Sequence, residues 1–330
     1  MPVIRRWSAD KMAPMRPLIP TSASGLSAAV SAGALAVVLL AGCGAEETEP
    51  TSSGTAPADG SATSSPSDDP TTSTTTQTPS ETAAPTATTP STTTVPVYFT
   101  GRTPLGLRLY REFREVEGDP LEAAVALLLE GDALDPDYGT LLQGVTVESV
   151  AAEDGALVVT LGEDSPLSAG KGTSPRRARL AVQSLVYTLQ GVAQTRDAVR
   201  VQLADGRPAD LYGQPTGAGV RAAPQLDVLA LVSLTSPQEG ATAAGTLSVQ
   251  GVASSFEATV PLAVLDSSGA EVLTDFATAE GFGDRLYPFE TELDVSGLAP
   301  GTYTLAARTD DPSGGEGPGP FEDTRTFTVG

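Results

Sequence analysis

The residue types that perform most enzyme chemistry are scarce in this sequence. Its 330 residues contain no histidine and one cysteine, Cys43. Without histidine the chain has no Ser-His or Cys-His nucleophile pair and no imidazole ligand for a metal ion. A lone cysteine forms no disulfide within the chain, and no second soft ligand joins it. Carboxylates are therefore the abundant groups with which this chain could catalyse a reaction.

Cys43 follows a segment that is typical of bacterial secretion signals. Basic residues precede an apolar run over residues 25–42, which is shorter than the roughly 20 residues of a membrane-spanning helix. Leu40-Ala41-Gly42-Cys43 resembles the bacterial lipobox, in which the cysteine thiol takes a diacylglycerol and the signal peptide is removed before it. An uncut signal anchor, or a cysteine that merely ends the apolar run, is the alternative. We expect a lipoprotein signal peptide over residues 1–42, with Cys43 carrying lipid such as palmitate.

Acidic side chains offer two further kinds of chemistry. Two carboxylates about 5 to 10 Å apart would suffice for a glycoside hydrolase, and the acids of residues 132–137 or Asp310-Asp311 could hold Ca²⁺. Neither run has EF-hand spacing, and acids in such numbers usually form a solvated surface. The glycine-rich residues 168–175 do not form a phosphate-binding loop, because Ser165 stands where that motif needs glycine. We therefore predict no catalytic, cofactor-binding or metal-binding residue.

Three arginines, Arg176, Arg177 and Arg179, form the densest basic cluster after the signal segment. They fall in the first turn of a predicted helix, where the helix dipole disfavours each cation by about 0.3 to 1 kcal/mol. In one interpretation the nearby acids Glu163 and Asp164 neutralise them. In the other they bind an acidic partner, with arginine–carboxylate pairs fixing the geometry. The three arginines are the candidate partner-binding site.

Composition separates an N-terminal tether from a folded part. The net charge is −22, and residues 1–42 are the more basic portion, so the remainder of the chain is strongly acidic and repels nucleic acid and anionic lipid. Residues 43–94 consist mainly of Thr, Ser, Pro and Ala. With almost no large apolar side chain, this segment cannot offset the entropy of ordering, and we predict a disordered tether.

Residues 95–212 have the pattern of an α+β domain. In the first predicted helix Asp119 is the N-cap, Pro120 takes the first position, Glu122 completes a capping box, and Gly131 ends the helix. The second helix begins at Ser174-Pro175 and ends at Gly191. Alternation and turn signals predict strands over residues 95–100, 107–116, 145–150, 156–161 and 199–203. The order strand, strand, helix, strand, strand, helix, strand predicts both helices on one face of a sheet.

Residues 228–330 have the pattern of an all-β sandwich, after a Gly- and Pro-rich linker over residues 213–227. Turn signals such as Ala299-Pro300-Gly301 separate the strand-like runs. Seven strands are predicted, over residues 228–235, 246–253, 257–266, 270–277, 287–293, 302–309 and 321–329.

Both folded parts resemble known families. "VPVYFT", "DPLEAAVALLLEG", "LAVQSLVYTL" and "VRVQLADG" are similar to the GerMN domain, which usually has Gly-Pro after its first helix where this chain has Gly131-Asp132 and a longer loop. The spacing Thr235-Ser236-Pro237 to Gly251-Val252-Ala253, with "GTYTLAARTDD", resembles the immunoglobulin-like domain of bacterial spore germination proteins (Gmad type). The first resemblance implies a domain of sporulation, germination and envelope proteins that acts through protein contacts and has no catalytic residues.

These observations favour a non-enzymatic protein anchored by lipid to the outer face of the bacterial cytoplasmic membrane. Its two domains would be an interaction or scaffold module for another envelope protein. Cell-wall glycan is a further possible binding partner, and nucleic acid is excluded as a partner by the negative charge. Two alternatives stay open. One is a carboxylate-dependent hydrolase of cell-wall glycan, which predicts two close acids in a cleft with one pKa raised. The other is a solute-binding lipoprotein, which needs a sizeable pocket between lobes.

Overall fold

The computed structural model describes residues 92–311 and 315–330. The predicted signal peptide, the lipobox with Cys43, and the tether up to residue 91 lie outside the described residues. Among the described residues, no helix combines the length and the apolar character that a membrane crossing requires.

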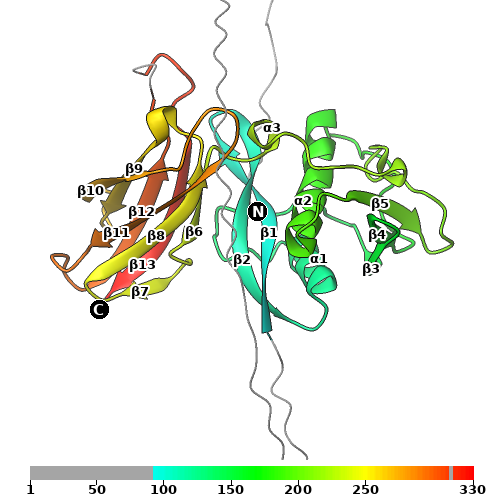
Figure 1. Ribbon diagram of the computed structural model, residues 1–330, viewed down its shortest axis with the longest axis horizontal. Helices are drawn as coiled ribbons and strands as arrows, with labels where there is room; N and C mark the ends of the chain where they lie inside the picture. Colours follow the sequence, from blue (N-terminus) through cyan, green and yellow to red (C-terminus); the bar gives the residue numbers. More distant parts are fainter. Residues whose placement is uncertain (1–91, 312–314) are drawn as a thin grey trace, which may run out of the picture. The chain divides into compact units, whose positions relative to one another are not determined.

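The first domain begins with a long β-hairpin (Figure 1). Strands β1 (Thr92–Thr103) and β2 (Gly106–Glu117) pair in antiparallel register along their full length. Helix α1 (Pro120–Glu130) follows, and then β3 (Val147–Glu153) and β4 (Ala156–Leu161), which are antiparallel. Helix α2 (Pro175–Ala193) connects β4 to the parallel strand β5 (Ala198–Leu203), as a crossover between parallel strands requires.

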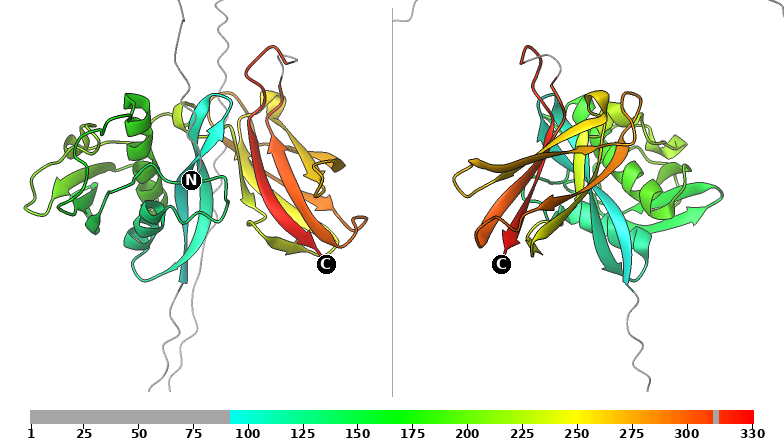
Figure 2. Two further views of the ribbon diagram at one scale, coloured as in Figure 1. Left: turned by 180° about the vertical axis from the view of Figure 1, so that it is seen from behind. Right: turned by 60° about the vertical axis from the view of Figure 1, so that its left-hand side comes forward.

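The α+β class and the order of elements are confirmed, but the strands form two sheets rather than one. The hairpin β1–β2 is one sheet and β3–β4–β5 is the other, and both helices lie between them in opposite views (Figures 1 and 2). The reason lies in α2, in which every residue from Leu180 to Gln190 is buried. A helix buried on all sides needs cover on two faces, which one sheet cannot provide.

The predicted helix caps are confirmed at three of four ends. The Asp119 carboxylate accepts hydrogen bonds from the backbone N–H groups of residues 121 and 122, and Gly131 ends α1 in the left-handed conformation at φ 71°. The Ser174 hydroxyl caps α2 by accepting from the N–H of residue 177. Helix α2 continues past Gly191 to Ala193, because glycine there allows close contact with β1 and does not break the helix.

The second domain is a two-sheet β sandwich. Its strands are β6 (Val232–Ser236), β7 (Ala241–Ala243), β8 (Thr246–Ala253), β9 (Thr259–Leu265), β10 (Glu271–Thr278), β11 (Tyr287–Asp294), β12 (Gly301–Arg308) and β13 (Glu322–Val329). One sheet has the order β10-β9-β12-β13-β7 and the other β11-β8-β6. The short strand β7 has no counterpart among the seven predicted strands. The first predicted strand, over residues 228–235, corresponds to β6, which begins only at Val232 because Gln225–Val228 forms the short helix α3. The 3₁₀ turn η1 (Thr216–Ala218) precedes α3. A second 3₁₀ turn, η2 (Phe256–Ala258), precedes β9.

Strand β2 contributes to the cores of both domains. Leu109 belongs to the first core and its neighbour Tyr110 to the second. The backbone of β2 is hydrogen-bonded toward the second domain, since the N–H of Ala230 donates to the Leu109 carbonyl and the N–H of Arg111 to the Ser233 hydroxyl. The hairpin lies between the helices and the sandwich in both views of Figure 2. The two domains are thus joined along one strand.

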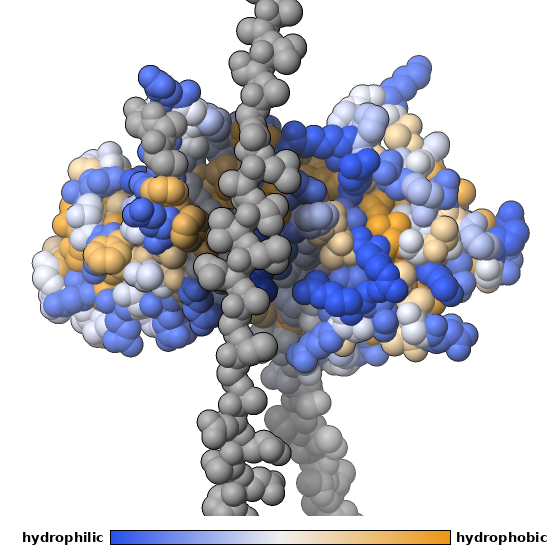
Figure 3. Space-filling model, turned by 45° about the horizontal axis from the view of Figure 1, so that its top comes forward, coloured by the Kyte–Doolittle hydropathy of each residue, from blue (hydrophilic) through white to orange (hydrophobic). Residues whose placement is uncertain are grey.

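Much of the visible surface is hydrophilic, with apolar patches between the polar side chains (Figure 3). Phe276 on β10 is the most exposed large apolar side chain that is described, at 60%. Phe256 and Phe282 are about half exposed and lie edge to face, with ring centroids 6.1 Å apart. Single exposed apolar residues such as Phe276 are normal on a protein of this size.

Candidate functional site

The loop of residues 132–140, which we call the Tyr138 loop, is held tightly against the hairpin. Gly139 and Thr100 exchange two backbone hydrogen bonds, of 2.7 and 2.9 Å. The buried carboxylate of Glu112 accepts from the N–H groups of Leu134 and Asp135, at 3.0 and 2.9 Å. These contacts hold the Tyr138 loop on the hairpin and direct its side chains toward the second domain.

Four side chains then form a buried polar cluster between the two domains, which we call the interdomain cluster: Asp135, Tyr138, Asp323 and Arg325. The Arg325 guanidinium forms ion pairs with Asp135 and with Asp323, the latter at 3.3 Å. It also donates to the Tyr138 hydroxyl at 3.1 Å, and that hydroxyl donates to Asp323 at 2.5 Å. All three charged residues are 3–4% exposed.

Burial dominates the electrostatics of the interdomain cluster. Desolvation raises the pKa of Asp135 to about 7, although the charge of Arg325 opposes the increase. The pKa of Asp323 is also raised by burial. Burial alone would lower the pKa of Arg325, but the charges of Asp323 and Asp135 outweigh it and the pKa is raised. Arg325 therefore stays charged and neutralises the two acids that face it.

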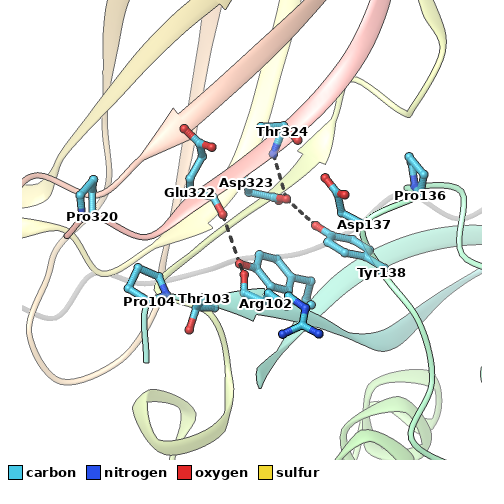
Figure 4. Close-up of a pocket in the computed structure, with 12 residues that line it drawn as sticks. Arg102, Thr103, Pro104, Pro136, Asp137, Tyr138, Pro320, Glu322, Asp323 and Thr324 are labelled. Carbon is cyan, nitrogen blue, oxygen red and sulfur yellow. Dashed lines mark hydrogen bonds between the residues drawn. The ribbon is translucent and has the colours of Figure 1, made fainter. Parts of the chain in front are cut away.

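A pocket of about 600 Å³ opens beside this cluster (Figure 4). Its walls come from the hairpin turn with Arg102 and Pro104, from the Tyr138 loop, and from the start of β13 with Glu322. Tyr110 forms part of the wall, stacks on Tyr138 with ring centroids 4.8 Å apart, and donates to the Glu322 carbonyl at 3.1 Å. Figure 4 shows Tyr138 and Asp323 pointing toward each other across the domain boundary.

The carboxylate oxygens of the cluster are already engaged in hydrogen bonds. Asp323 Oδ1 accepts from Tyr138, Thr324 and Arg325, and Oδ2 accepts from the N–H of Leu234 at 2.6 Å. One oxygen of Asp135 accepts from the N–H of Asp137 and the other from Arg325. A general acid or nucleophile needs an oxygen that can reach a substrate. The arrangement favours joining the domains over catalysis.

Two of the acids considered for Ca²⁺, Asp132 and Asp135, have positively charged partners. Asp132 forms an ion pair with Arg114 at 3.0 Å, and Asp135 is paired with Arg325. Glu112, on which the Tyr138 loop rests, lies 3.9 Å from Arg114. These acids have structural roles within and between the domains.

The predicted partner-binding arginines lie on the surface at the start of α2. Arg176, Arg177 and Arg179 are all exposed, and Arg176 donates to the Leu105 carbonyl at 3.0 Å. In the part of the chain that the structure describes, neither Glu163 nor Asp164 forms an ion pair with them. Arg176 and Arg179 border a hollow of about 440 Å³ that also includes Leu107 and Asp227.

Asp323 and Arg325 are not among the residues predicted from the sequence, although a signal for them exists. In β13 the buried residues alternate as Asp323, Arg325, Phe327 and Val329. The two charged residues therefore fall on the inward-facing positions of the strand, where an apolar side chain is normally found. Charges at such positions indicate buried partners, but only the tertiary structure identifies them as Asp135 and Tyr138.

Comparison with known proteins gives matches to two families. Residues 96–210 match the family described as "Sporulation and spore germination" (Germane), and residues 231–316 match the "Immunoglobulin-like domain of bacterial spore germination" (Gmad2). Among curated proteins the sequence has no significant match.

Solved structures show weaker likenesses. The tandem GerMN domains of the sporulation protein GerM from Bacillus subtilis are 14% identical, over 63% of this chain and 63% of that one, with a TM-score of 0.32. CopC from Methylosinus trichosporium OB3b is 25% identical, over 29% of this chain and 90% of that one, with a TM-score of 0.20. The chain thus spans less than two thirds of the GerM structure. The two family matches show that the chain consists, over residues 96–210 and 231–316, of a GerMN domain followed by the immunoglobulin-like domain of bacterial spore germination.

Proposed function

We propose that this protein is a non-enzymatic, lipid-anchored protein of the bacterial cell envelope whose two domains act together as one protein-interaction module. The observation that carries the proposal is the interdomain cluster. The carboxylates of Asp135 and Asp323 are engaged in hydrogen bonds and ion pairs that hold the domains to each other. A hydrolase would instead require at least one of these oxygens to face a substrate. Both domain families are named for spore germination, which agrees with an interaction role.

The proposed contact surface is the arginine cluster at the start of α2. Arg176, Arg177 and Arg179 are exposed cations on a chain whose net charge is −22. An acidic protein partner would gain charge-assisted hydrogen bonds there and would be repelled elsewhere on the surface. The proposed partner is therefore another envelope protein that presents carboxylates.

A pull-down from the envelope of the native host tests this surface. The full chain serves as bait, beside a variant in which Arg176, Arg177 and Arg179 are all changed to Glu. The matched control changes Arg200, Arg207 and Arg285 to Glu, because these exposed arginines give the same change in net charge at other positions. A partner retained by the wild type and the control but lost by the first variant would support the proposal. Equal retention by all three would exclude this surface.

The lipid anchor is tested separately at Cys43. Cells that make the wild type are labelled with radioactive palmitate, and the expected product is labelled, membrane-bound and lacks residues 1–42. Cys43→Ser should carry no label and keep the signal segment, because the thiol that takes the lipid is gone. An unlabelled wild type would contradict the lipid anchor and leave the interaction role to be judged by the pull-down.

A further inference from the structure

The hollow beside the start of α2, which we call the α2 hollow, has a largely apolar lining. Its volume of about 440 Å³ lies within the range of pockets that bind small ligands, about 300–1,000 Å³. Three segments that are distant in the sequence form it: the start of β2, the first turns of α2, and residues 223–228. Its apolar members are Leu107, Pro175, Leu180, Ala223 and Val228. Leu107 and Ala223 are only half-buried, so apolar surface in the hollow is open to solvent.

Two exposed arginines of α2 border the hollow. Arg176 and Arg179 are three positions apart and are therefore neighbours on one side of the helix. The Arg176 guanidinium donates to the Leu105 carbonyl at 3.0 Å, which holds it beside the hairpin turn. A guanidinium has five N–H donors, so this bond leaves others for a ligand. Both cations can thus be reached by a ligand that enters the hollow from solvent.

The positive charge at the hollow is not balanced by nearby acids. Burial lowers the pKa of Arg108, the neighbour of Leu107 on β2, and the charge of Arg176 lowers it further, while Asp227 opposes the change. Asp227 is the one acid among the described residues that line the hollow. Within the described residues, neither Asp227 nor any of these arginines forms an ion pair. Three cations thus face one carboxylate, and the local field attracts anions to a chain whose net charge is −22.

An apolar hollow bordered by cations fits a ligand that has an apolar group next to carboxylates. A fatty acid offers one carboxylate, whereas two arginines one helical turn apart suit a peptide with acidic residues on both sides of an apolar one. We propose that the α2 hollow takes a large apolar side chain of the protein partner, while the acidic residues that flank it pair with Arg176 and Arg179. This inference rests on the proposed function and adds that the recognised segment is apolar as well as acidic.

Calorimetric titration of the full chain, in a detergent without net charge, tests the proposal with three capped peptides. Glu-Glu-Phe-Glu-Glu, the Phe peptide, has both features. Glu-Glu-Ser-Glu-Glu, the Ser peptide, keeps the acids but lacks the apolar side chain. Gln-Gln-Phe-Gln-Gln, the Gln peptide, keeps the apolar side chain but lacks the acids. We expect the Phe peptide to bind at least about tenfold more tightly than either of the others, because each of them loses one set of contacts.

Variants locate the binding. Ala223→Phe fills the hollow without changing an arginine and should lower the affinity for the Phe peptide to that for the Ser peptide. Ala222→Phe is the matched control, because Ala222 is also half-buried but does not line the hollow. Arg179→Gln should weaken binding of both acidic peptides several-fold, whereas Arg207→Gln, in an exposed turn outside the hollow, should not. Thermal unfolding reports whether each variant folds. The comparison of peptides on the wild type decides the proposal if Ala223→Phe does not fold.

Three outcomes would overturn the inference, and they separate it from the proposed function. Equal affinity for the Phe and Ser peptides, with both weakened by Arg179→Gln, would exclude the hollow but leave the arginine cluster as the contact surface. Equal weakening by Arg179→Gln and Arg207→Gln would show binding through general charge and would count against both. Displacement of the Phe peptide by an equal concentration of hexanoate would replace the protein segment with a small amphiphilic acid.

Discussion

At the scale of single residues, Arg325 connects the two domains through buried ion pairs and hydrogen bonds. It is 3% exposed, pairs with two carboxylates, and donates to Tyr138 and to the Leu234 carbonyl. A buried ion pair gives little net stability against a well-packed apolar pair, but removing one partner leaves the other charge buried and unpaired. Because Asp135 and Asp323 belong to different domains, the loss would affect the boundary between them.

Replacing Arg325 tests this role. We expect Arg325→Met to lower the free energy of unfolding by about 3 to 5 kcal/mol, because two buried carboxylates lose their cation. The exposed pair Arg207–Asp205 provides the control, and Arg207→Met should cost less than about 1 kcal/mol. Urea unfolding followed by circular dichroism measures both. Equal effects of the two substitutions would show that the cluster is not the main contact between the domains.

The raised pKa of Asp135 predicts a pH dependence of stability. Desolvation raises its pKa to about 7 in the folded protein, against 3.8 for a free aspartate. The folded state therefore binds a proton that the unfolded state releases, so the stability that this group contributes is complete below about pH 4. It is lost as the pH rises through about 7.

Comparison with Asp135→Asn isolates this effect. Unfolding free energies at several pH values between 4 and 8 should show the wild type falling relative to the variant as the pH rises, because asparagine does not titrate. Arg325 and Asp323, which face Asp135, are the same in both proteins, so their contributions largely cancel. A constant difference across this range would contradict the assignment of the titration to Asp135.

At the scale of elements, helix α2 sets the architecture of the first domain. Its buried polar side chains are satisfied by specific neighbours: the Thr188 hydroxyl accepts from the N–H of Tyr98 at 3.0 Å, and Gln183 exchanges hydrogen bonds with the segment around Ala223. These contacts let a helix with polar residues be buried between two sheets. The helix approaches β1 closely at Gly191, where an added Cβ would lie 2.8 Å from Pro96 Cγ.

Gly191 therefore provides a test of this helix–sheet contact. Gly191→Ala places a methyl group against the rigid Pro96 ring, and we expect a destabilisation of about 1 to 3 kcal/mol, as is usual for overpacking. Gly170→Ala is the control, because nothing lies within 4 Å of the Cβ that it would add. Thermal unfolding compares the two. A stability gain in Gly191→Ala, as expected for alanine in an unconstrained helix, would contradict the close contact.

At the scale of the whole described structure, the two domains share contacts that are unusual for units joined by a simple linker. Strand β2 supplies Leu109 to one core and Tyr110 to the other. The Tyr138 loop rests on Glu112 in the first domain and reaches Asp323 and Arg325 in the second. Domains that share a strand and a buried ion cluster should unfold together.

Calorimetry of the full chain tests this coupling. We expect one cooperative transition for the folded part, because neither core is complete without the other domain. The double variant Tyr138→Phe, Asp323→Asn removes the hydrogen bond between the domains and should broaden the transition or divide it in two. Asp266→Asn, in an exposed turn of the second domain, should leave one transition. Two transitions in the wild type would show that the domains are independent.

The sequence by itself determined the local elements of this protein and its two domain classes. Helix ends follow from side chains close in the chain, so the caps Asp119, Gly131 and Ser174 were predictable. The strands of the sandwich follow from alternation and turn residues within a few positions. The resemblance to two families rested on such local patterns, and both families match.

Only the tertiary structure decided what depends on residues far apart in the chain. The division into two sheets follows from the burial of α2 on all sides. The sequence does not reveal this burial, because several of the buried side chains are polar. Asp135 and Arg325 are 190 positions apart, and Gln190 and Arg111 are brought into one pocket by the packing of a helix on a hairpin. Periodicity describes which face of an element is buried, but it does not specify the partner across the interface. The partner depends on how the elements pack. In the described residues, this packing brings the buried charges together and leaves a few buried polar atoms without a hydrogen-bond partner.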